Sequence, residues 1–292
     1  MNERPASDTE TTTEHLNRVG GWVGRYAVVG QLDRAAPAHL RCTQRPSAAG
    51  LSGPLLRMRV ETGEVGTQPN IVYDQFQRSL PAEGLGWIES SAVSMGVAVQ
   101  LATTSATLRW VWPVQAPMGV STALLLERSW ILTMQALALG HGGIVLHGAS
   151  VVVDGQASVI VGQSGAGKST LAARLGSQGL HDDVCLVARQ GGQWQVWAQN
   201  VYRPYGSATT GVFPLRRLLL LGDQRDRTVT EPLPAGQAAM LLLAQTFDAS
   251  GAAEHLLADA VQDLINELGM AKLNHSLTDG VDLLRAALEG ER

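Results

Sequence analysis

One stretch of the sequence sets the architecture of the chain: Val159-Ile160-Val161-Gly162-Gln163-Ser164-Gly165-Ala166-Gly167-Lys168-Ser169-Thr170. An apolar, β-branched run comes first, a glycine-rich loop follows, and helix-forming residues continue to Leu175. The loop contains the complete pattern G-x-x-x-x-G-K-[ST], and its place between a strand and a helix distinguishes a P-loop from a chance glycine turn. The sequence therefore predicts a nucleotide-binding domain of the α/β class.

The P-loop predicts how a nucleoside triphosphate and its Mg²⁺ would be held. Glycines allow consecutive backbone N–H groups to turn toward phosphate oxygens, and the following helix directs its positive end at the same anion. Lys168 is expected to reach the β- and γ-phosphates, and the Ser169 hydroxyl is expected to ligate Mg²⁺. The predicted nucleotide-binding residues are Gly162, Ser164, Gly165, Ala166, Gly167, Lys168, Ser169 and Thr170.

The rest of the chain divides into a leader and two domains. With 292 residues, of which 45% are hydrophobic, it can bury one substantial core and a smaller one. Residues 1–16 are rich in Thr, Glu, Asp and Asn and predict a disordered leader. Residues 17–119 predict a smaller, mostly β N-terminal domain, because short β-like runs alternate there with Gly and Pro. Residues 120–292 form the predicted P-loop domain.

Within the P-loop domain the pattern alternates between strands and helices. A core-packing helix is expected over residues 121–139, with Ser121 as its cap. Two apolar runs, a turn at Asp154-Gly155 and the P-loop strand follow it. After the P-loop helix, residues 184–188 are β-like, an irregular loop is expected from Arg203 to Leu215, and residues 218–221 form a buried strand. Helical periodicity marks residues 235–247, 252–268 and 280–288.

Composition excludes several classes of protein. The net charge is −4 and there is no long Lys/Arg block, so neither nucleic acid nor an anionic membrane is an expected partner. Cys42 and Cys185 are far apart and have no metal-ligand spacing, which argues against a disulfide or a zinc site. No secretory signal or membrane span is visible, and we expect a soluble, cytoplasmic protein. The oligomeric state stays open, a homo-oligomer included.

Two aspartates and one histidine are the candidates for chemistry beside the P-loop. Asp182 and Asp183 precede a β-like run about one helix after Lys168, where the chain could return them to the phosphates. One carboxylate could hold Mg²⁺ while the other accepts a hydroxyl proton, and Ser169 and Asp183 are the predicted metal ligands. If both aspartates are extended, their side chains point to opposite faces. The alternative is an acidic turn that opens a strand.

The remaining polar candidates are weaker. His147 ends an apolar run and is followed by Gly148, where the chain could approach a ligand, although a lone histidine is often structural. His181 adjoins the aspartates and could tune them, or it could lie in an exposed turn. Arg203 and Arg174 are cationic candidates near phosphates, and Arg174 is expected on the solvent face of its helix.

Taken together, these motifs resemble the C-terminal catalytic domain of the HPr kinase/phosphorylase family. The similarity covers residues 140–225 and is closest to the HPr-kinase-related branch, whose members include kinases that tailor lasso-peptide precursors. The resemblance implies a phosphoenolpyruvate-carboxykinase-like α/β core that binds ATP and phosphorylates a serine hydroxyl on a protein or peptide. It assigns active-site roles to His147, Lys168, Ser169, Asp182 and Asp183.

Two departures narrow what the resemblance implies. Thr170 stands where the bifunctional members have an acidic residue, and their downstream glycine-rich segment is missing. The resemblance therefore implies neither phosphorylase activity nor HPr as the substrate. The leading hypothesis is an ATP-dependent kinase acting on a Ser or Thr hydroxyl of a peptide or protein. A small-molecule kinase and a nucleotide-binding accessory protein without phosphoryl transfer remain the alternatives.

Overall fold

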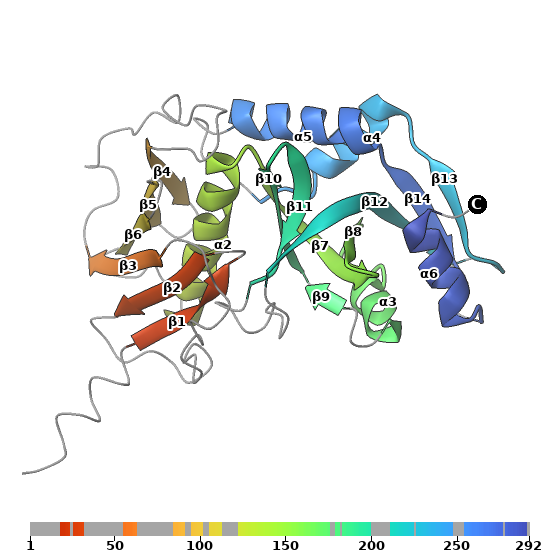
Figure 1. Cartoon of the computed structure of the whole chain (residues 1–292), viewed down its shortest axis with the longest axis horizontal. Coiled ribbons are helices and arrows are strands. Elements are labelled where there is room, and N and C mark those ends of the chain that lie inside the picture. Colours follow the sequence, from red (N-terminus) through yellow and green to blue (C-terminus); the bar gives the residue numbers. More distant parts are fainter. Residues whose placement is uncertain are drawn as a thin grey trace, which may run out of the picture.

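The computed structural model describes residues 18–23, 26–31, 55–62, 84–90, 95–101, 105–112, 122–175, 179–181, 183–199, 211–224, 226–247, 254–276 and 278–290. These residues form a mixed α/β fold whose core is mostly sheet. One sheet lies on each side of a long helix, α2 (Thr122–Gly140), as Figure 1 shows. The predicted leader, residues 1–16, lies outside the described residues.

The first sheet comes from the N-terminal part of the chain. It has six strands in the order β1-β2-β3-β6-β5-β4. Strand β3 is parallel to both of its neighbours, β2 and β6. The sequence pattern predicts four of these strands and misses β1 and β4, whose glycines interrupt the apolar run. The strands are β1 (Arg18–Val23), β2 (Tyr26–Gln31), β3 (Leu55–Thr62), β4 (Gly84–Ser90), β5 (Met95–Leu101) and β6 (Ser105–Trp112).

Helix α2 packs against both sheets. It contacts β4, β5 and β6 of the first sheet and β7 (Ile144–Val153) and β10 (Val184–Gln190) of the second. Residues 129–139 are all buried, among them Trp130, Met134 and Leu137. These residues make up about three helical turns, so this part of α2 is covered on every side. The core-packing helix predicted over residues 121–139 is therefore confirmed, within one residue at its end.

The second sheet contains the P-loop strand. Its order is β11-β10-β7-β8-β12-β14-β13, with β9 beside β7, and β11 pairs in addition with β12. Strands β10, β7, β8, β12 and β11 consequently form a closed ring. The remaining bounds are β8 (Gln156–Val161), β9 (Gly179–His181), β11 (Gln193–Trp197), β12 (Val212–Gln224), β13 (Val229–Pro232) and β14 (Ala271–His275).

Four further helices cover this sheet. The short α3 (Lys168–Arg174) follows the P-loop, and α6 (Val281–Glu289) shares a hydrophobic cluster with it. Helix α5 (Glu254–Leu268) buries the apolar face predicted for it and packs against α4 (Ala235–Leu243). Helix α4 was predicted to continue to residue 247. It ends at Leu243 because residues 245 and 246 bond instead to the backbone of β7.

Strand β12 begins earlier than the sequence predicts. The loop expected from Arg203 to Leu215 gives way to strand at Val212, because Phe213 pairs with Val196 of β11. Strands β13 and β14 are also absent from the sequence prediction, since polar residues such as Lys272 and Asn274 break the apolar pattern of β14. Within the described part of the chain, no helix combines the length and the apolar character needed to cross a membrane.

Candidate functional site

The glycine-rich loop predicted to be a P-loop lies between β8 and α3, where the sequence predicts it. Gly165 and Gly167 have φ angles of 78° and 97°, in the left-handed region that favours glycine. A Cβ atom at either position would meet no heavy atom within 4 Å, so conformation and not space requires glycine there. The backbone amide of Ala166 donates to Gln163 O at 3.1 Å and closes the turn.

Lys168 points back along the loop that precedes it. Its side chain is buried, with 5% of its surface exposed, and its ammonium donates to Gly162 O at 2.8 Å and Gln163 O at 3.1 Å. A buried ammonium is stable only with such partners. These bonds keep the positive charge inside the curve of the loop, where the phosphates of a nucleotide would lie.

His147 is presented by β7, the strand next to the P-loop strand. Its neighbour Gly148 pairs with Val161, the last residue of β8, which brings His147 to the P-loop end of the sheet. A Cβ atom at Gly148 would lie 2.8 Å from Ile160 O. The close approach of strand β8 therefore requires glycine at this position, a reason that the sequence interpretation of Gly148 did not include.

Asp183 lies across from His147 at the start of β10. Its Oδ1 atom is 3.9 Å from His147 Nε2, which is an ion-pair distance and longer than a hydrogen bond. Both side chains are accessible, with 35% of His147 and 44% of Asp183 exposed. The φ angle of Asp183 is 71°, so this residue is not extended. The strand alternation expected for the aspartate pair does not apply to it.

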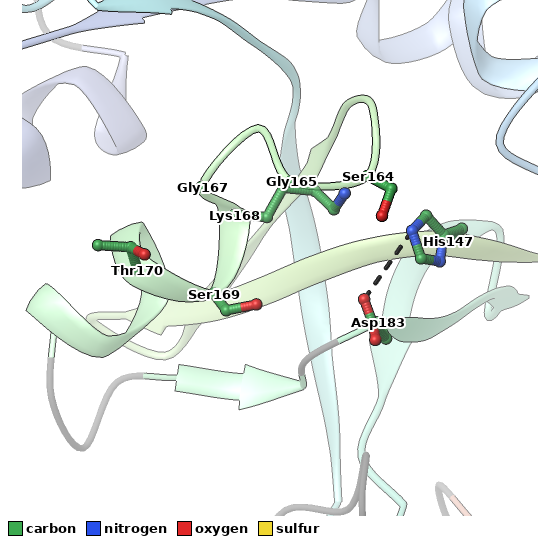
Figure 2. Close-up of a pocket in the computed structure, with 8 residues that line it drawn as sticks. All are labelled: His147, Ser164, Gly165, Gly167, Lys168, Ser169, Thr170 and Asp183. Carbon is green, nitrogen blue, oxygen red and sulfur yellow. Dashed lines mark ion pairs between the residues drawn. The ribbon is translucent and has the colours of Figure 1, made fainter.

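One cavity joins these groups. Its volume is about 220 Å³, and it is lined by His147, Ser164, Gly165, Gly167, Lys168, Ser169, Thr170 and Asp183. Figure 2 shows the Ser164 hydroxyl directed toward His147 and the Ser169 hydroxyl directed toward Asp183. Small-molecule pockets usually measure roughly 300–1,000 Å³, and this cavity is smaller than that range.

The structure brings together most of the predicted site residues. His147, Asp183 and six of the predicted P-loop residues line the cavity, including the exposed Thr170. Gly162 contributes a carbonyl to Lys168, and Ala166 packs against the hydrophobic cluster under the loop. The predicted catalytic residue Asp182 lies outside the described residues, and so does Arg203.

Arg174 has a different place from both of its sequence interpretations. Its guanidinium donates to Ser276 O at 3.0 Å and to Asp279 O at 2.7 Å, in the connection between β14 and α6. The side chain is neither near the phosphate cavity nor free on a solvent face. It ties the end of the P-loop helix to the C-terminal part of the domain. His181, the other polar candidate, lies in β9, where its backbone pairs with that of Ser150 in β7.

The donor set fits Mg²⁺ bound together with a nucleotide. The Ser169 hydroxyl and the Asp183 carboxylate line one cavity, and oxygen ligands are those that Mg²⁺ prefers. No group of three or more His, Cys, Asp and Glu side chains that could hold a metal occurs among the described residues. Mg²⁺ in phosphoryl-transfer sites is usually held by one or two protein ligands and by substrate phosphates, which matches Ser169 and Asp183.

Sequence reasoning missed a segment that contacts His147. The His147 amide donates to Gln245 O at 2.7 Å, and the rings of His147 and Phe247 meet at 6.2 Å between centroids, with 79° between their planes. The sequence predicted a helix over residues 235–247, and no local pattern there indicates that residues 245–247 contact strand β7, which is far away in the chain.

Comparisons with known proteins do not show a family for this chain. No protein-family model matches the chain, and no curated protein is similar to it in sequence. Among solved structures, it is similar to the Hpr(Ser) kinase/phosphatase from Coxiella burnetii, with 14% identity over 51% of this chain and 95% of that chain. The TM-score of 0.29 indicates a distant relationship at most.

Proposed function

We propose that this protein is an ATP-dependent kinase that transfers the γ-phosphoryl group to a Ser or Thr hydroxyl of a peptide or protein. The observation that carries the proposal is that Lys168, Ser169, His147 and Asp183 line the same cavity. In a phosphoryl transfer the attacking hydroxyl must be positioned and must lose its proton. A carboxylate and an imidazole beside the glycine-rich loop are groups that could do both.

The roles follow from the chemistry of each group. Lys168 would offset negative charge on the phosphates, and Ser169 would hold Mg²⁺, which would supply further positive charge to stabilise the transferred group. The Asp183 carboxylate either completes the Mg²⁺ site or accepts the hydroxyl proton. His147, at 3.9 Å from Asp183, orients that carboxylate or receives its proton. Asp182 takes whichever of the two carboxylate roles Asp183 does not.

The proposal includes a phosphoenolpyruvate-carboxykinase-like core and a place in a peptide biosynthetic pathway. Both rest on the resemblance of the His147-Gly148, P-loop and Asp182-Asp183 motifs to HPr-kinase-related proteins. The order of these motifs along β7, the P-loop and the start of β10 supports the proposed core. His147 and Asp183 are a third to a half exposed, so an acceptor hydroxyl that arrives from solution could reach both side chains.

The first test separates nucleotide binding from catalysis. Calorimetry with a non-hydrolysable ATP analogue and Mg²⁺ should show binding to the wild type and a severe loss in Lys168→Ala and Lys168→Met. Lys272→Ala is the matched control, because this lysine lies on β14 in an exposed ion pair with Asp223, which should add little to stability. Unchanged affinity in both Lys168 variants, with unchanged circular dichroism, would contradict the P-loop assignment.

The second part uses radiolabelled ATP and a degenerate library of Ser- and Thr-containing peptides. Asp183→Asn should slow transfer by roughly 10²–10⁴-fold if Asp183 is the base, with analogue binding largely retained. If Asp183 is instead the metal ligand, Mg²⁺-dependent analogue binding should weaken as well. Nucleotide binding without labelled peptide would exclude the proposed acceptor class. Labelling of a small hydroxyl compound would then favour a small-molecule kinase, and its absence an accessory protein.

A further inference from the structure

The segment formed by residues 245–247 contacts His147 at two points and its neighbour Leu146 at a third. The backbone of Gln245 accepts the His147 amide at 2.7 Å, and Thr246 forms an isolated antiparallel bridge with Leu146. Phe247 places its ring against the imidazole in an edge-to-face arrangement, at 6.2 Å and 79°. Aromatic pairs favour this geometry because the positive edge of one ring meets the negative face of the other.

Phe247 is itself fixed from helix α2. The side-chain amide of Gln135 donates to Phe247 O at 3.0 Å. Gln135 is completely buried among apolar neighbours of α2, such as Met134 and Leu137, and its Oε1 atom has no hydrogen-bond partner among the described residues. A half-satisfied buried amide adds little to stability. The bond does, however, define where the Phe247 backbone lies.

We propose that Phe247 is a positioning residue for His147, and that Gln135 of α2 holds Phe247 in place. The proposal rests on the proposed function, which makes His147 an active-site residue. The χ2 torsion of histidine is broad, so a side chain that is 35% exposed needs a neighbour to select one ring orientation. The Phe247 ring, packed nearly perpendicular to the imidazole, keeps Nε2 on the side of Asp183.

This orientation matters because the Nε2–Oδ1 separation is 3.9 Å, just beyond hydrogen-bond reach. A small rotation of the imidazole decides whether it approaches the carboxylate or leaves it. Displacements of about 1 Å in a reacting group can change a rate by about 10²-fold. Phe247 and Gln135 therefore act on the reaction through His147 and contact no substrate themselves.

The test compares Phe247→Leu with Phe213→Leu in the full chain. Both phenylalanines are partly buried and pack on the same hydrophobic core, but the ring contact with His147 belongs to Phe247. The main readout is the NMR signal of the His147 ring, assigned by its loss in His147→Asn. The other readouts are thermal stability, affinity for the ATP analogue, and the transfer rate with the Ser/Thr peptide library.

Phe247→Leu should move and broaden the His147 ring signal, whereas Phe247→Tyr, which keeps the ring, should restore it. Gln135→Met should move the signal in the same direction, and it serves as the second variant if Phe247→Leu does not fold. Analogue affinity should stay at the wild-type value while the peptide transfer rate of Phe247→Leu falls by roughly 10–10²-fold. Phe213→Leu should change thermal stability only.

A His147 ring signal that is unchanged in both Phe247→Leu and Gln135→Met would overturn the inference. An equal change in Phe213→Leu would overturn it too, since the effect would then come from general loosening of the core. Failure of the proposed function looks different. In that case the wild type binds no analogue or labels no peptide, although the NMR comparison still reports whether Phe247 orients His147.

Discussion

Asp183 combines a backbone conformation that most residues avoid with a carboxylate at the centre of the site. Its φ angle of 71° lies in the left-handed region, and its carbonyl accepts the Gly148 amide at 3.2 Å. Asp and Asn tolerate this region better than other residues with a side chain, for which it costs roughly 1–2 kcal/mol. Two requirements therefore restrict which residue can stand at position 183: the left-handed backbone and the need for a carboxylate in the site.

The first residue-scale prediction separates these two constraints. Asp183→Asn should keep the free energy of unfolding, because Asn also accepts the left-handed conformation, whereas Asp183→Ala should lose about 1 kcal/mol. Urea unfolding of both variants measures the difference. Equal free energies of unfolding for the two variants would contradict the prediction, because they would show that the backbone at residue 183 relaxes when the side chain is replaced.

His275 gives a residue-scale prediction in pH. Burial, and secondarily the positive charge of Arg174, lower the pKa of His275 below its ordinary value of 6.5. The unfolded chain therefore takes up a proton at a higher pH than the folded protein. The resulting loss of stability is absent above pH 6.5 and develops as the pH falls below 6.5 toward the folded pKa.

His275→Gln should remove this dependence, so the stability difference between the variant and the wild type should change with pH just below 6.5 and stay constant above it. Asp279 does not interfere. Hydrogen bonds from Thr228 lower the pKa of Asp279 below 3.8, and the stability it contributes is lost only as the pH falls through that lower value. Thermal unfolding at closely spaced pH values measures the difference, and parallel curves for the two proteins would contradict the prediction.

At the scale of elements, the packing of β7 against β8 depends on Gly148. A Cβ atom there would lie 2.8 Å from Ile160 O and 3.1 Å from Val161 Cγ1, and the first of these is backbone that cannot turn away. Gly148→Ala should therefore cost roughly 1–3 kcal/mol of stability, as overpacking does. Gly236→Ala in α4 is the control, because a Cβ atom there meets nothing within 4 Å and alanine favours a helix by up to about 1 kcal/mol. A stable Gly148→Ala protein would show that the two strands can separate.

The elements also show what the sequence could and could not predict. The P-loop, its flanking strand and helix, and the β7–β8 hairpin were predictable, because local patterns of glycine and apolar residues define them. The resemblance to HPr-kinase-related proteins assigned His147 and Asp183 to one active site, and the structure places their side chains 3.9 Å apart. The left-handed backbone of Asp183, the Phe247 contact and the carbonyl partners of Arg174 were not predictable. Each depends on a contact between segments far apart in the chain, which leaves no periodic pattern in the sequence.

At the scale of the whole molecule, α2 links the two sheets. Its buried residues are covered from both sides, so neither sheet can unfold without exposing part of an apolar helix. We therefore expect one cooperative unfolding transition, although the sequence predicts separate domains at residues 17–119 and 120–292. The described tryptophans report on both parts: Trp22, Trp87, Trp110 and Trp112 lie in the first sheet, Trp130 in α2, and Trp194 and Trp197 in the second sheet.

The measurement is thermal unfolding with and without the ATP analogue and Mg²⁺. A ligand present at 100 times its dissociation constant stabilises the folded state by about 2.7 kcal/mol. The whole transition should move upward as one unit, by circular dichroism and by tryptophan fluorescence alike. Two transitions, of which only one moves with the nucleotide, would show that the parts unfold independently.

The closed ring of strands limits how an acceptor peptide can be recognised. Strand β8 is hydrogen-bonded to β7 and β12, and β7 to β8 on one side and to β10 and β9 on the other. Many peptide-binding proteins capture an extended peptide by adding it to an open sheet edge, where main-chain bonds provide affinity for almost any sequence. The two strands that lead into this site offer no such edge. For the proposed kinase, a peptide could therefore not be bound by adding a strand to β7 or β8, and at these two strands recognition would depend on the side chains of the peptide.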